Sequence, residues 1–591
     1  MDGVSTRHDA PGRVGRTVRV TGPLLEAEGV PDVAMGEILH VGADRISAEV
    51  VAVDGTRATM QAYEYTGGLR VGAPAAGSGQ PLTGLFGPGL LGAAFDGLMR
   101  PLTSAPIWLR PDRPESVAGA DGGRRWRFVP TVRAGDGVSE GDVLGTVPHS
   151  GAVEHRVIVP AGASGTVDWI ADDCEVGALD AVARIGVAGV GDREVRLSER
   201  WPMRRPRPFR ERQADPVPLH TGQRVLDLFF PVPRGAAAAV TGGFGTGKTM
   251  LLQQIAKWCD ADVIVYVGCG ERGNEMADVL DDLGRLTDAR SGGRLVERTV
   301  VVANTSNMPM MARELSIYTG ISIAEYYRDM GYQAVVIADS TSRWAEALRE
   351  FANRRGDLPA EEGFPADLAS QLAAFYERAG RVTTLGGHDA SVTVIGAVSP
   401  PGGDMSEPVT TITQRFVRAM WMLDRDLAYA RHYPAVHWSG SFARDTDGLA
   451  RWQTVHGDPE WAARRATALA ILAEADRLSS LAEVIGVGSL PGRERMVVLG
   501  GRLLRESVLA QNALHPNDAT CSDAKGAALL DLVLGVIDAC HAAIDRGATA
   551  TAVERLDFGP VIRAAQDVGT DQAGAVAEIR DRMVAQLGEL P

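Results

Sequence analysis

Residues 236–258 read AAAAVTGGFGTGKTMLLQQIAKW, and the rest of the chain is best interpreted from this segment. The apolar run AAAAVT is typical of a buried strand, and MLLQQIAKW has a helical pattern. Between them lies a match to the template G-x-x-x-x-G-K-[ST]. Glycines let such a loop curl until its backbone N–H groups face phosphate oxygens. We therefore predict a phosphate-binding loop between a strand and a helix, formed by Gly242, Gly243, Phe244, Gly245, Thr246, Gly247, Lys248 and Thr249.

Lysine is rare in this chain, which makes Lys248 informative. Of the 60 basic residues only three are lysines, namely Lys248, Lys257 and Lys525. The lysine of a phosphate-binding loop meets the β- and γ-phosphates of a nucleotide, and the hydroxyl that follows it is a ligand of Mg²⁺. We expect these roles for Lys248 and Thr249, with Mg²⁺ as cofactor and ATP or ADP as substrate.

Two further candidate positions follow apolar runs downstream of the loop. Asp339 ends the run AVVIAD, and a carboxylate at such a strand end holds Mg²⁺, usually through water. Glu271 and Arg272 follow the run VIVYVG. Because ligands sit at the carboxyl ends of parallel strands, Glu271 is placed to polarise the water that attacks the γ-phosphate. The pattern leaves two alternatives open: both residues are charges on a solvated loop, or Glu275 is the working acid.

The flanking patterns divide the chain into four predicted domains. Residues 1–85 alternate apolar and polar positions about an Asp54–Gly55 hairpin signal, which favours a β-barrel. Frequent turn signals over 110–200 predict a separate β-rich module. Residues 205–445 alternate apolar runs with helical periods, as in a parallel sheet covered on both faces. Residues 446–591 have a helical pattern without strand runs.

The composition argues against several classes of protein. The net charge is −15, which disfavours a protein whose main task is gripping nucleic acid. The five cysteines form no CxxC pair, so structural zinc and a disulfide framework are poorly supported and a reducing cytosol is favoured. We expect no secretory signal, because the first residues, MDGVSTRHDAPGRVGRTV, include no apolar segment. We expect no membrane-spanning segment, because the best candidate, residues 526–544, carries Asp531 and Asp538. The chain can still lie on a membrane through partners.

Six motifs in order carry a family resemblance: GGFGTGKT, GERGNEM, IADSTSRWAEALRE, EEGFPADLASQLAAFYERAG, SPPGGDMSEPVT and RHYPAVHW. This set resembles the catalytic A subunit of rotary V-type (A/V-type) ATPases and ATP synthases. The resemblance runs from about residue 15 to beyond 520, and residues 110–200 resemble the "bulge" domain of that subunit. It implies a multidomain α/β fold: an N-terminal β-barrel, an inserted bulge domain, a central RecA-like P-loop domain and a C-terminal α-helical domain.

The resemblance also implies an activity and partners. Such a subunit interconverts ATP plus water and ADP plus phosphate, coupled by partner subunits to proton or sodium transport. Three copies alternate with three non-catalytic B subunits in a ring, with central and peripheral stalks and a membrane ion-conducting sector. The complex lies peripherally on the cytoplasmic side of the membrane. A B subunit supplies an arginine finger that this chain does not contain.

Individual residues can be carried over from the resemblance. Glu271 matches the family's catalytic glutamate, and Arg272 matches the arginine that helps hold that carboxylate. Tyr433 fits an aromatic position beside the adenine. Leu514 stands where the family usually has an aromatic, and leucine can still pack on a base. Arg343 is expected near the site or in an ion pair with Glu346 or Glu350.

Two residues depart from the family pattern, and three alternative functions are considered. Gln371 replaces a common arginine and Asp367 a common tyrosine, which puts subunit coupling in question but leaves the chemistry intact. A hexameric RNA translocase shares the barrel and P-loop, but the net charge of −15 counts against it. A protein-export ATPase lacks the 110–200 insert, and a purely regulatory subunit does not need the intact Lys248 and Glu271. The sequence does not choose between H⁺ and Na⁺.

Overall fold

The computed structural model describes residues 13–102 and 123–590, which belong to two compact units. The first unit comprises Met1–Gln213 and Ala261–Gly396, and the second comprises Ala214–Asp260 and Ala397–Pro591. The start of the predicted N-terminal domain and residues 110–122 of the predicted insert lie outside the described residues. Each unit is described by itself.

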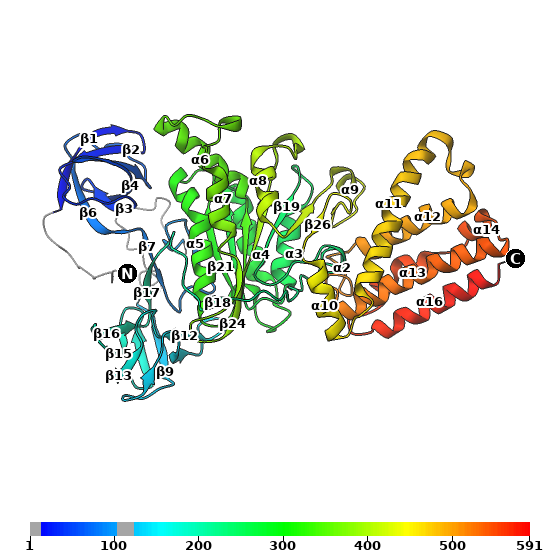
Figure 1. Cartoon of the computed structure of the whole chain (residues 1–591), viewed down its shortest axis with the longest axis horizontal. Helices are drawn as coiled ribbons and strands as arrows, with labels where there is room; N and C mark the ends of the chain where they lie inside the picture. The colour runs from blue at the N-terminus through cyan, green and yellow to red at the C-terminus, as the bar shows by residue number, and fades with distance from the viewer. Residues whose placement is uncertain (1–12, 103–122, 591) are drawn as a thin grey trace. The chain divides into compact units, whose positions relative to one another are not determined.

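The first unit begins with a closed six-stranded barrel, drawn in blue in Figure 1. Alternating apolar side chains such as Leu25, Leu39 and Met60 fill its interior, which confirms the predicted barrel. The β4–β5 hairpin turns at Gly55, whose φ of 56° suits glycine. In the order β1-β2-β5-β4-β3-β6, the strands are β1 (Val14–Thr21), β2 (Leu24–Glu28), β5 (Arg57–Ala62), β4 (Ile46–Asp54), β3 (Glu37–Val41) and β6 (Pro74–Pro81).

The inserted module consists of two four-stranded sheets around a shared apolar core. Trp126, Phe128 and Leu144 are among the side chains buried there. One sheet has the order β10 (Gly137–Val138), β13 (Gly165–Ile170), β15 (Ala181–Val187) and β16 (Gly191–Arg196). The other has the order β12 (His155–Ile158), β11 (Val143–Val147), β9 (Arg125–Pro130) and β14 (Cys174–Gly177). Two further strands pair outside this module, β7 (Thr83–Phe86) and β17 (Glu199–Pro202).

The rest of the first unit is built on parallel strands. Every residue of β20 and β21 is buried, so helices or other segments cover both faces, as continuous apolar runs predict. The parallel order is β8 (Ala94–Phe95), β21 (Thr299–Asn304), β20 (Val263–Cys269), β22 (Gln333–Asp339) and β24 (Asp389–Val398); β23 (Gly380–Thr383) and β18 (Glu211–Arg212) add antiparallel pairs. The α-helices in the described part of this unit are α4 (Gly273–Arg285), α5 (Met310–Asp329), α6 (Thr341–Arg355) and α7 (Leu368–Tyr376).

The second unit combines a small group of strands with helices. β19 (Ala237–Thr241) runs parallel to β25 (Ala419–Met422), which pairs with β26 (Phe442–Ala443). The phosphate-binding loop leads from β19 into α3 (Lys248–Trp258). The remaining helices near these strands are α2 (Arg224–Phe229), α8 (Pro408–Phe416), α9 (Arg425–Tyr429) and α10 (Thr446–His456).

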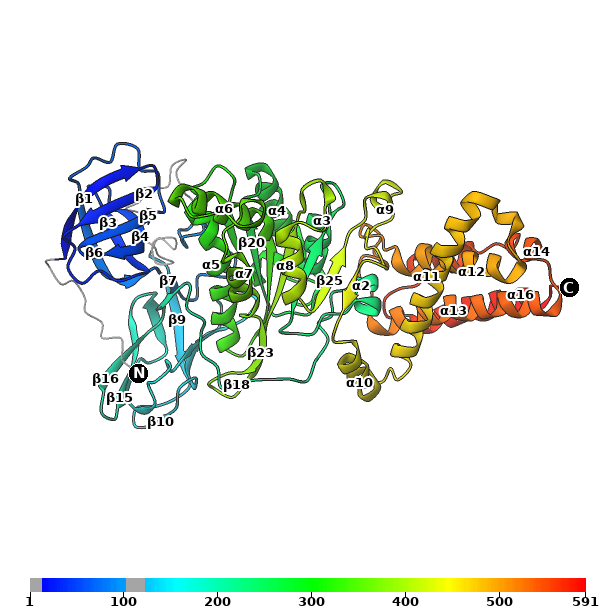
Figure 2. The ribbon, with the colours of Figure 1, turned by 45° about the horizontal axis from the view of Figure 1, so that its top comes forward.

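A bundle of helices forms the C-terminal part of the second unit. α13 (Asp523–Arg546) packs along α16 (Ala573–Gly588), as Figure 2 shows. Among the described residues α13 is long and apolar enough to cross a membrane by length and composition, and the residues it buries in the bundle account for that composition. The other members are α11 (Trp461–Ile485), α12 (Gly492–Leu503), a π-helical turn (Leu504–Leu509), α14 (Ala550–Glu554) and α15 (Gly559–Asp567).

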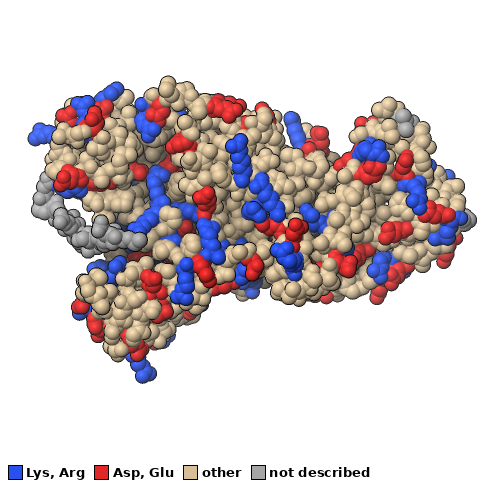
Figure 3. Space-filling view, in the orientation of Figure 1, with Lys and Arg blue, Asp and Glu red and all other residues tan. Residues whose placement is uncertain are grey.

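Charged side chains of both signs are interspersed on the face of the molecule seen in Figure 3. This mixture is typical of a protein surface that is not dedicated to a polyanion.

Candidate functional site

The predicted phosphate-binding loop has the backbone geometry that its glycines allow. β19 is buried along its whole length and delivers the loop at Gly242. Gly245 and Gly247 have φ values of 80° and 91°, in the left-handed region that side chains disfavour. Thr246 is buried, and its hydroxyl donates to the carbonyl oxygen of Gly243 at 2.9 Å, which braces the loop. The strand, the loop and the helix are thus formed as predicted.

The two charged or polar groups at the end of the loop begin α3. The Nζ atom of Lys248 donates to the carbonyl oxygens of Gly242 at 2.6 Å and Gly243 at 2.9 Å, so the ammonium group lies over the loop. Thr249 is exposed in the first turn of α3. Phe244 is 91 % exposed at the tip of the loop.

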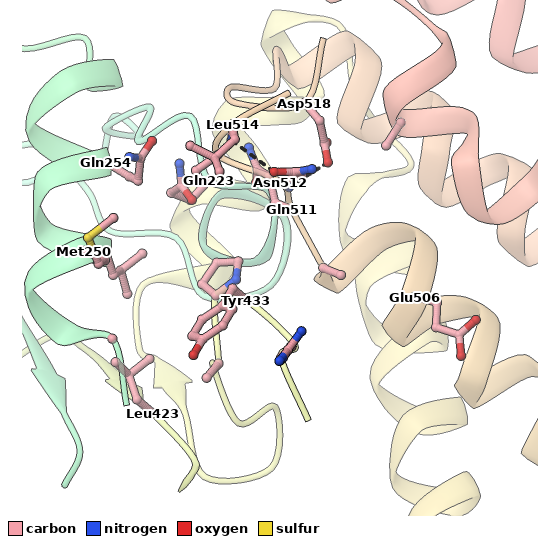
Figure 4. Close-up of a pocket in the computed structure, with 18 of the residues that line it drawn as sticks. Gln223, Met250, Gln254, Leu423, Tyr433, Glu506, Gln511, Asn512, Leu514 and Asp518 are labelled. Carbon is pink, nitrogen blue, oxygen red and sulfur yellow. Dashed lines mark hydrogen bonds between the residues drawn. The ribbon is translucent and has the colours of Figure 1, made fainter. Parts of the chain in front are cut away.

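A cavity of about 730 Å³ opens beside the loop within the second unit (Figure 4). The ring of Tyr433 lies 3.5 Å from where a Cβ atom on Gly247 would stand, so the aromatic ring packs at van der Waals distance from the loop. Leu514 is 94 % exposed, and its backbone N–H donates to Oδ1 of Asn512 at 3.0 Å. The two expected base-binding residues, which lie far apart in the sequence, therefore line one cavity.

Buried polar contacts fix the wall that carries Leu514. The Arg224 guanidinium donates to the carboxylate of Asp518 and to the carbonyl oxygens of Val508 and Ala510. The carboxylate of Asp518 in turn accepts from the backbone N–H of Asn512 at 2.7 Å. The segment around Asn512 is therefore tied to Arg224, the first residue of α2.

The first unit places Glu271 in a group of carboxylates. β20 and β22 are neighbours in register, with Gly268 opposite Asp339, so Glu271 and Asp339 emerge at the same edge. Burial, the charge of Asp339 and a hydrogen bond with Glu275 raise the pKa of Glu271 to about 8, against the opposing effect of Arg343. A carboxyl group with a pKa near neutrality suits general acid–base chemistry. Glu275, the alternative candidate for the working acid, is thus a hydrogen-bonded neighbour of Glu271.

Asp339 and Arg272 have different surroundings. Asp339 is buried and accepts a hydrogen bond from the Tyr266 hydroxyl at 3.2 Å. Burial and the charge of Asp339 hold the pKa of Tyr266 well above its usual value, so the hydroxyl stays a donor. The guanidinium of Arg272 is 70 % exposed and lies 3.9 Å from Glu275. The expected contact of Arg272 with Glu271 stays a prediction.

Three other expectations from the sequence are placed by the structure. Arg343 forms the expected ion pair with Glu346 at 3.0 Å while it also acts electrostatically on Glu271. The two departures from the family pattern interact with each other, because Nε2 of Gln371 donates to Asp367 at 2.9 Å. This exposed pair, one turn apart at the start of α7, gives the two departures a shared local role.

Sequence reasoning missed residues whose role depends on their neighbours. Tyr266 stands inside an apolar strand, where its hydroxyl was the one polar group that could have signalled a contact. Gln223 lines the cavity beside Leu514 and gave no signal in the sequence, since a lone glutamine before a short helix is common.

Comparisons with known proteins agree with these features. Four family models match: the ATP synthase alpha/beta family beta-barrel domain (residues 17–79), the alpha/beta subunit barrel-sandwich domain (117–204), the alpha/beta family nucleotide-binding domain (222–443) and the C-terminal domain of V and A type ATP synthase (450–553). A solved structure, the type III secretion ATPase EscN of enteropathogenic E. coli, covers 88 % of this chain and 100 % of its own at a TM-score of 0.62 and 21 % identity, which shows the fold.

Curated relatives extend over nearly the whole chain. A V-type ATP synthase alpha chain of Nitrosococcus oceani is 46 % identical over 98 % of both chains. One of Anaeromyxobacter sp. (strain K) is 48 % identical over 98 % of this chain and 99 % of the relative. The corresponding A chain of the A-type ATP synthase of Methanopyrus kandleri is 45 % identical over 98 % of both. The chain therefore belongs to the family of V-type and A-type ATP synthase alpha (A) chains, the catalytic subunits of these enzymes.

Proposed function

We propose a division of roles by which this catalytic subunit interconverts ATP plus water and ADP plus phosphate. The proposal rests on the loop between β19 and α3, with glycines at left-handed φ values and Lys248 at its end. Backbone N–H groups of the loop and the N-terminus of α3 bind phosphate oxygens. Lys248 neutralises charge that builds on the β- and γ-phosphates in the transition state.

Glu271 orients and polarises the attacking water. Its raised pKa supports this role, because a more basic carboxylate accepts a proton more readily from water. Arg272 stabilises negative charge near the transferred phosphoryl group, and its exposed guanidinium is available for this. Tyr433 and Leu514 hold the base in the cavity beside the loop.

The oxygen donors fit a magnesium ion. Thr249 supplies a hydroxyl and Asp339 a buried carboxylate, and Mg²⁺ prefers such hard oxygen ligands. Among the described residues no group of three or more His, Cys, Asp or Glu side chains is arranged to hold a metal ion, which suits an ion bound mainly by substrate phosphates and water. When bound, Mg²⁺ supplies positive charge that offsets the phosphate charges.

We also propose partners and a location, and the family membership supports them. We place the chain in a ring with three non-catalytic B subunits, which supply an arginine finger, and with central and peripheral stalks. The ring lies on the cytoplasmic side of a membrane whose ion-conducting sector carries protons or sodium ions. The match of residues 450–553 to the V and A type C-terminal domain supports this assembly over an RNA translocase or an export ATPase.

The test uses inverted membrane vesicles that contain the assembled complex. Replacement Glu271→Gln keeps the side chain's size and removes its basicity, so ATP hydrolysis should fall at least about 100-fold. The control Asp281→Asn makes the same chemical change on exposed helix α4 and should leave the rate within twofold. Hydrolysis by Glu271→Gln above half the normal rate would contradict the assignment.

The same vesicles decide the coupled ion. ATP-driven acidification of the lumen that a protonophore abolishes, and that Glu271→Gln lacks, would establish proton coupling. Uptake of ²²Na⁺ that resists the protonophore, with no acidification, would establish sodium coupling.

A further inference from the structure

One carboxamide in the cavity has an unused hydrogen-bond donor. Gln223 is only 3 % exposed and lines the cavity beside the phosphate-binding loop. Its Nε2 atom is buried and has no hydrogen-bond partner among the described residues. Figure 4 shows the side chain between Gln254 and Leu514, on the cavity wall. Because an unpaired buried N–H group costs free energy, a ligand acceptor that reached this donor would be bound favourably.

A neighbouring glutamine shows what a purely structural carboxamide looks like in this region. Gln511 is also buried, but both ends of its side chain are used. Its Oε1 accepts from the backbone N–H of Arg224 at 2.8 Å, and its Nε2 donates to the carbonyl oxygen of Gly222 at 2.9 Å. Gln511 thus joins two segments of the wall, whereas the Nε2 donor of Gln223 has no partner among the described residues.

The backbone of Gln223 is held firmly, so its side chain starts from a fixed point. Its carbonyl oxygen accepts from the N–H groups of Leu226 at 3.0 Å and Asp227 at 2.9 Å, and its own N–H donates to the Thr221 hydroxyl at 3.2 Å. A donor that is positioned before the ligand arrives loses little conformational entropy on binding.

We infer that Gln223 is a specificity-determining residue that reads the hydrogen-bonding edge of the nucleotide base. The inference rests on the proposed placement of the base in this cavity beside Tyr433. Purine rings carry nitrogen acceptors at N1, N3 and N7, and one of them accepts from Nε2 of Gln223. Adenine presents such an acceptor next to its 6-amino donor, the complement of a carboxamide. At the N1 edge guanine presents an N1–H donor, which opposes the Gln223 donor, and at the N7 edge it presents O6 in place of the 6-amino group, which opposes the carboxamide oxygen.

Binding of modified nucleotides to the full-length chain tests this inference. Dissociation constants are measured for MgADP and for its 1-deaza, 3-deaza and 7-deaza analogues, each of which replaces one acceptor nitrogen with C–H. In the unmodified protein one analogue should bind about tenfold more weakly than MgADP, because the loss of its acceptor nitrogen leaves the buried donor of Gln223 unpaired. In Gln223→Leu, which lacks the donor, the same analogue should bind within twofold of MgADP.

A control and a second variant keep the result interpretable. Gln253→Leu makes the same change on α3 at a residue that does not line the cavity, and should retain the tenfold difference. Gln223→Met removes the donor with an unbranched side chain, in case the leucine variant does not fold. Equal binding of all three analogues by the unmodified protein would overturn the inference without any variant, and so would a tenfold difference that persists in both Gln223 variants.

Tyr433→Ala separates this failure from a failure of the base placement. If Tyr433→Ala weakens MgADP binding while the Gln223 variants show no coupling to any analogue, only the role of Gln223 falls. If Tyr433→Ala leaves MgADP binding unchanged, the base lies elsewhere and both proposals are withdrawn.

Discussion

Replacing Lys525 with methionine removes an ammonium group from the interior of the C-terminal helices. The side chain is completely buried, and Nζ donates to the carbonyl oxygens of Asn517, Ala565 and Val568 at 2.5, 2.8 and 2.8 Å. Ala565 lies in the last turn of α15 and Val568 just beyond it, where helix carbonyls lack partners inside the helix. Methionine fills similar space but has no donor.

The size of the effect follows from these three acceptors. A buried carbonyl left without a donor costs about 1–3 kcal/mol. Because burial of the ammonium group itself opposes folding, the net loss is smaller than three such penalties, and we expect about 3–5 kcal/mol. For a cooperative unit of about 150–250 residues this corresponds to a fall in Tm of roughly 6–20 °C.

Differential scanning calorimetry of the full-length chain at pH 7.5 measures this loss. Asn517 adjoins Asp518, which lines the cavity beside the phosphate-binding loop together with Ala565, so on the proposed placement of the nucleotide the affinity for MgADP should fall as well. The matched control is Lys257→Met, whose ammonium lies 4.6 Å from the ring of Trp258 and should contribute less than about 1 kcal/mol. If Lys525→Met melts within 2 °C of Lys257→Met, taken as roughly the 1 kcal/mol limit, the carbonyl contacts do not stabilise the bundle as argued.

Three further predictions concern other parts of the chain. His155 contacts the Tyr326 hydroxyl at 2.6 Å, and burial lowers the pKa of its imidazole to about 3. Below pH 6.5, the pKa of histidine in the unfolded chain, the unfolded chain therefore binds a proton at this residue that the folded chain does not bind. The free energy of unfolding should therefore fall by about 2 kcal/mol more between pH 7.5 and pH 5 in the unmodified protein than in His155→Gln, and urea titrations that show equal falls would contradict this. Leu514→Phe places an aromatic ring on the wall of the cavity in which we propose that the base binds, and should tighten MgADP binding about two- to fivefold, measured by calorimetry; weaker binding would argue against base contact at this position. Arg224→Met leaves the buried carboxylate of Asp518 without its cation and should cost about 3–5 kcal/mol in thermal unfolding, and adding Asp518→Asn should recover part of that loss, whereas additive effects would refute the pairing.

Local sequence patterns predicted a large share of the fold. The barrel hairpin at Gly55, the buried parallel strands and the loop before α3 all depend on residues close together in the chain, whose periodicity and turn preferences act locally. The division of residues between two compact units had no such signal. Residues 214–260 group with 397–591, although the sequence pattern ran continuously from 205 to 445.

The residues of the candidate site that belong to a continuous sequence motif could be predicted from the sequence, whereas contacts between distant segments could not. Lys248 and Thr249 belong to one contiguous motif, and Glu271 and Asp339 each follow an apolar strand, so their types and positions could be inferred. The surroundings of Glu271 could not, because the pKa of a carboxyl group depends on burial and on charges brought close by folding, here Asp339 and Glu275.

The class of chemistry was already set by the amino-acid sequence, since a P-loop motif specifies both a backbone shape and the groups that meet phosphate. Which distant residues share the cavity emerged only from the folded chain. Tyr433 and Leu514 line it together with Gln223. The neighbouring Gln511 has both ends of its carboxamide satisfied, while the side-chain Nε2 of Gln223 is left unpaired among the residues that the structure describes. Hydrogen-bond satisfaction is a property of three-dimensional neighbours rather than of residue type, so no pattern along the chain could have distinguished these two glutamines.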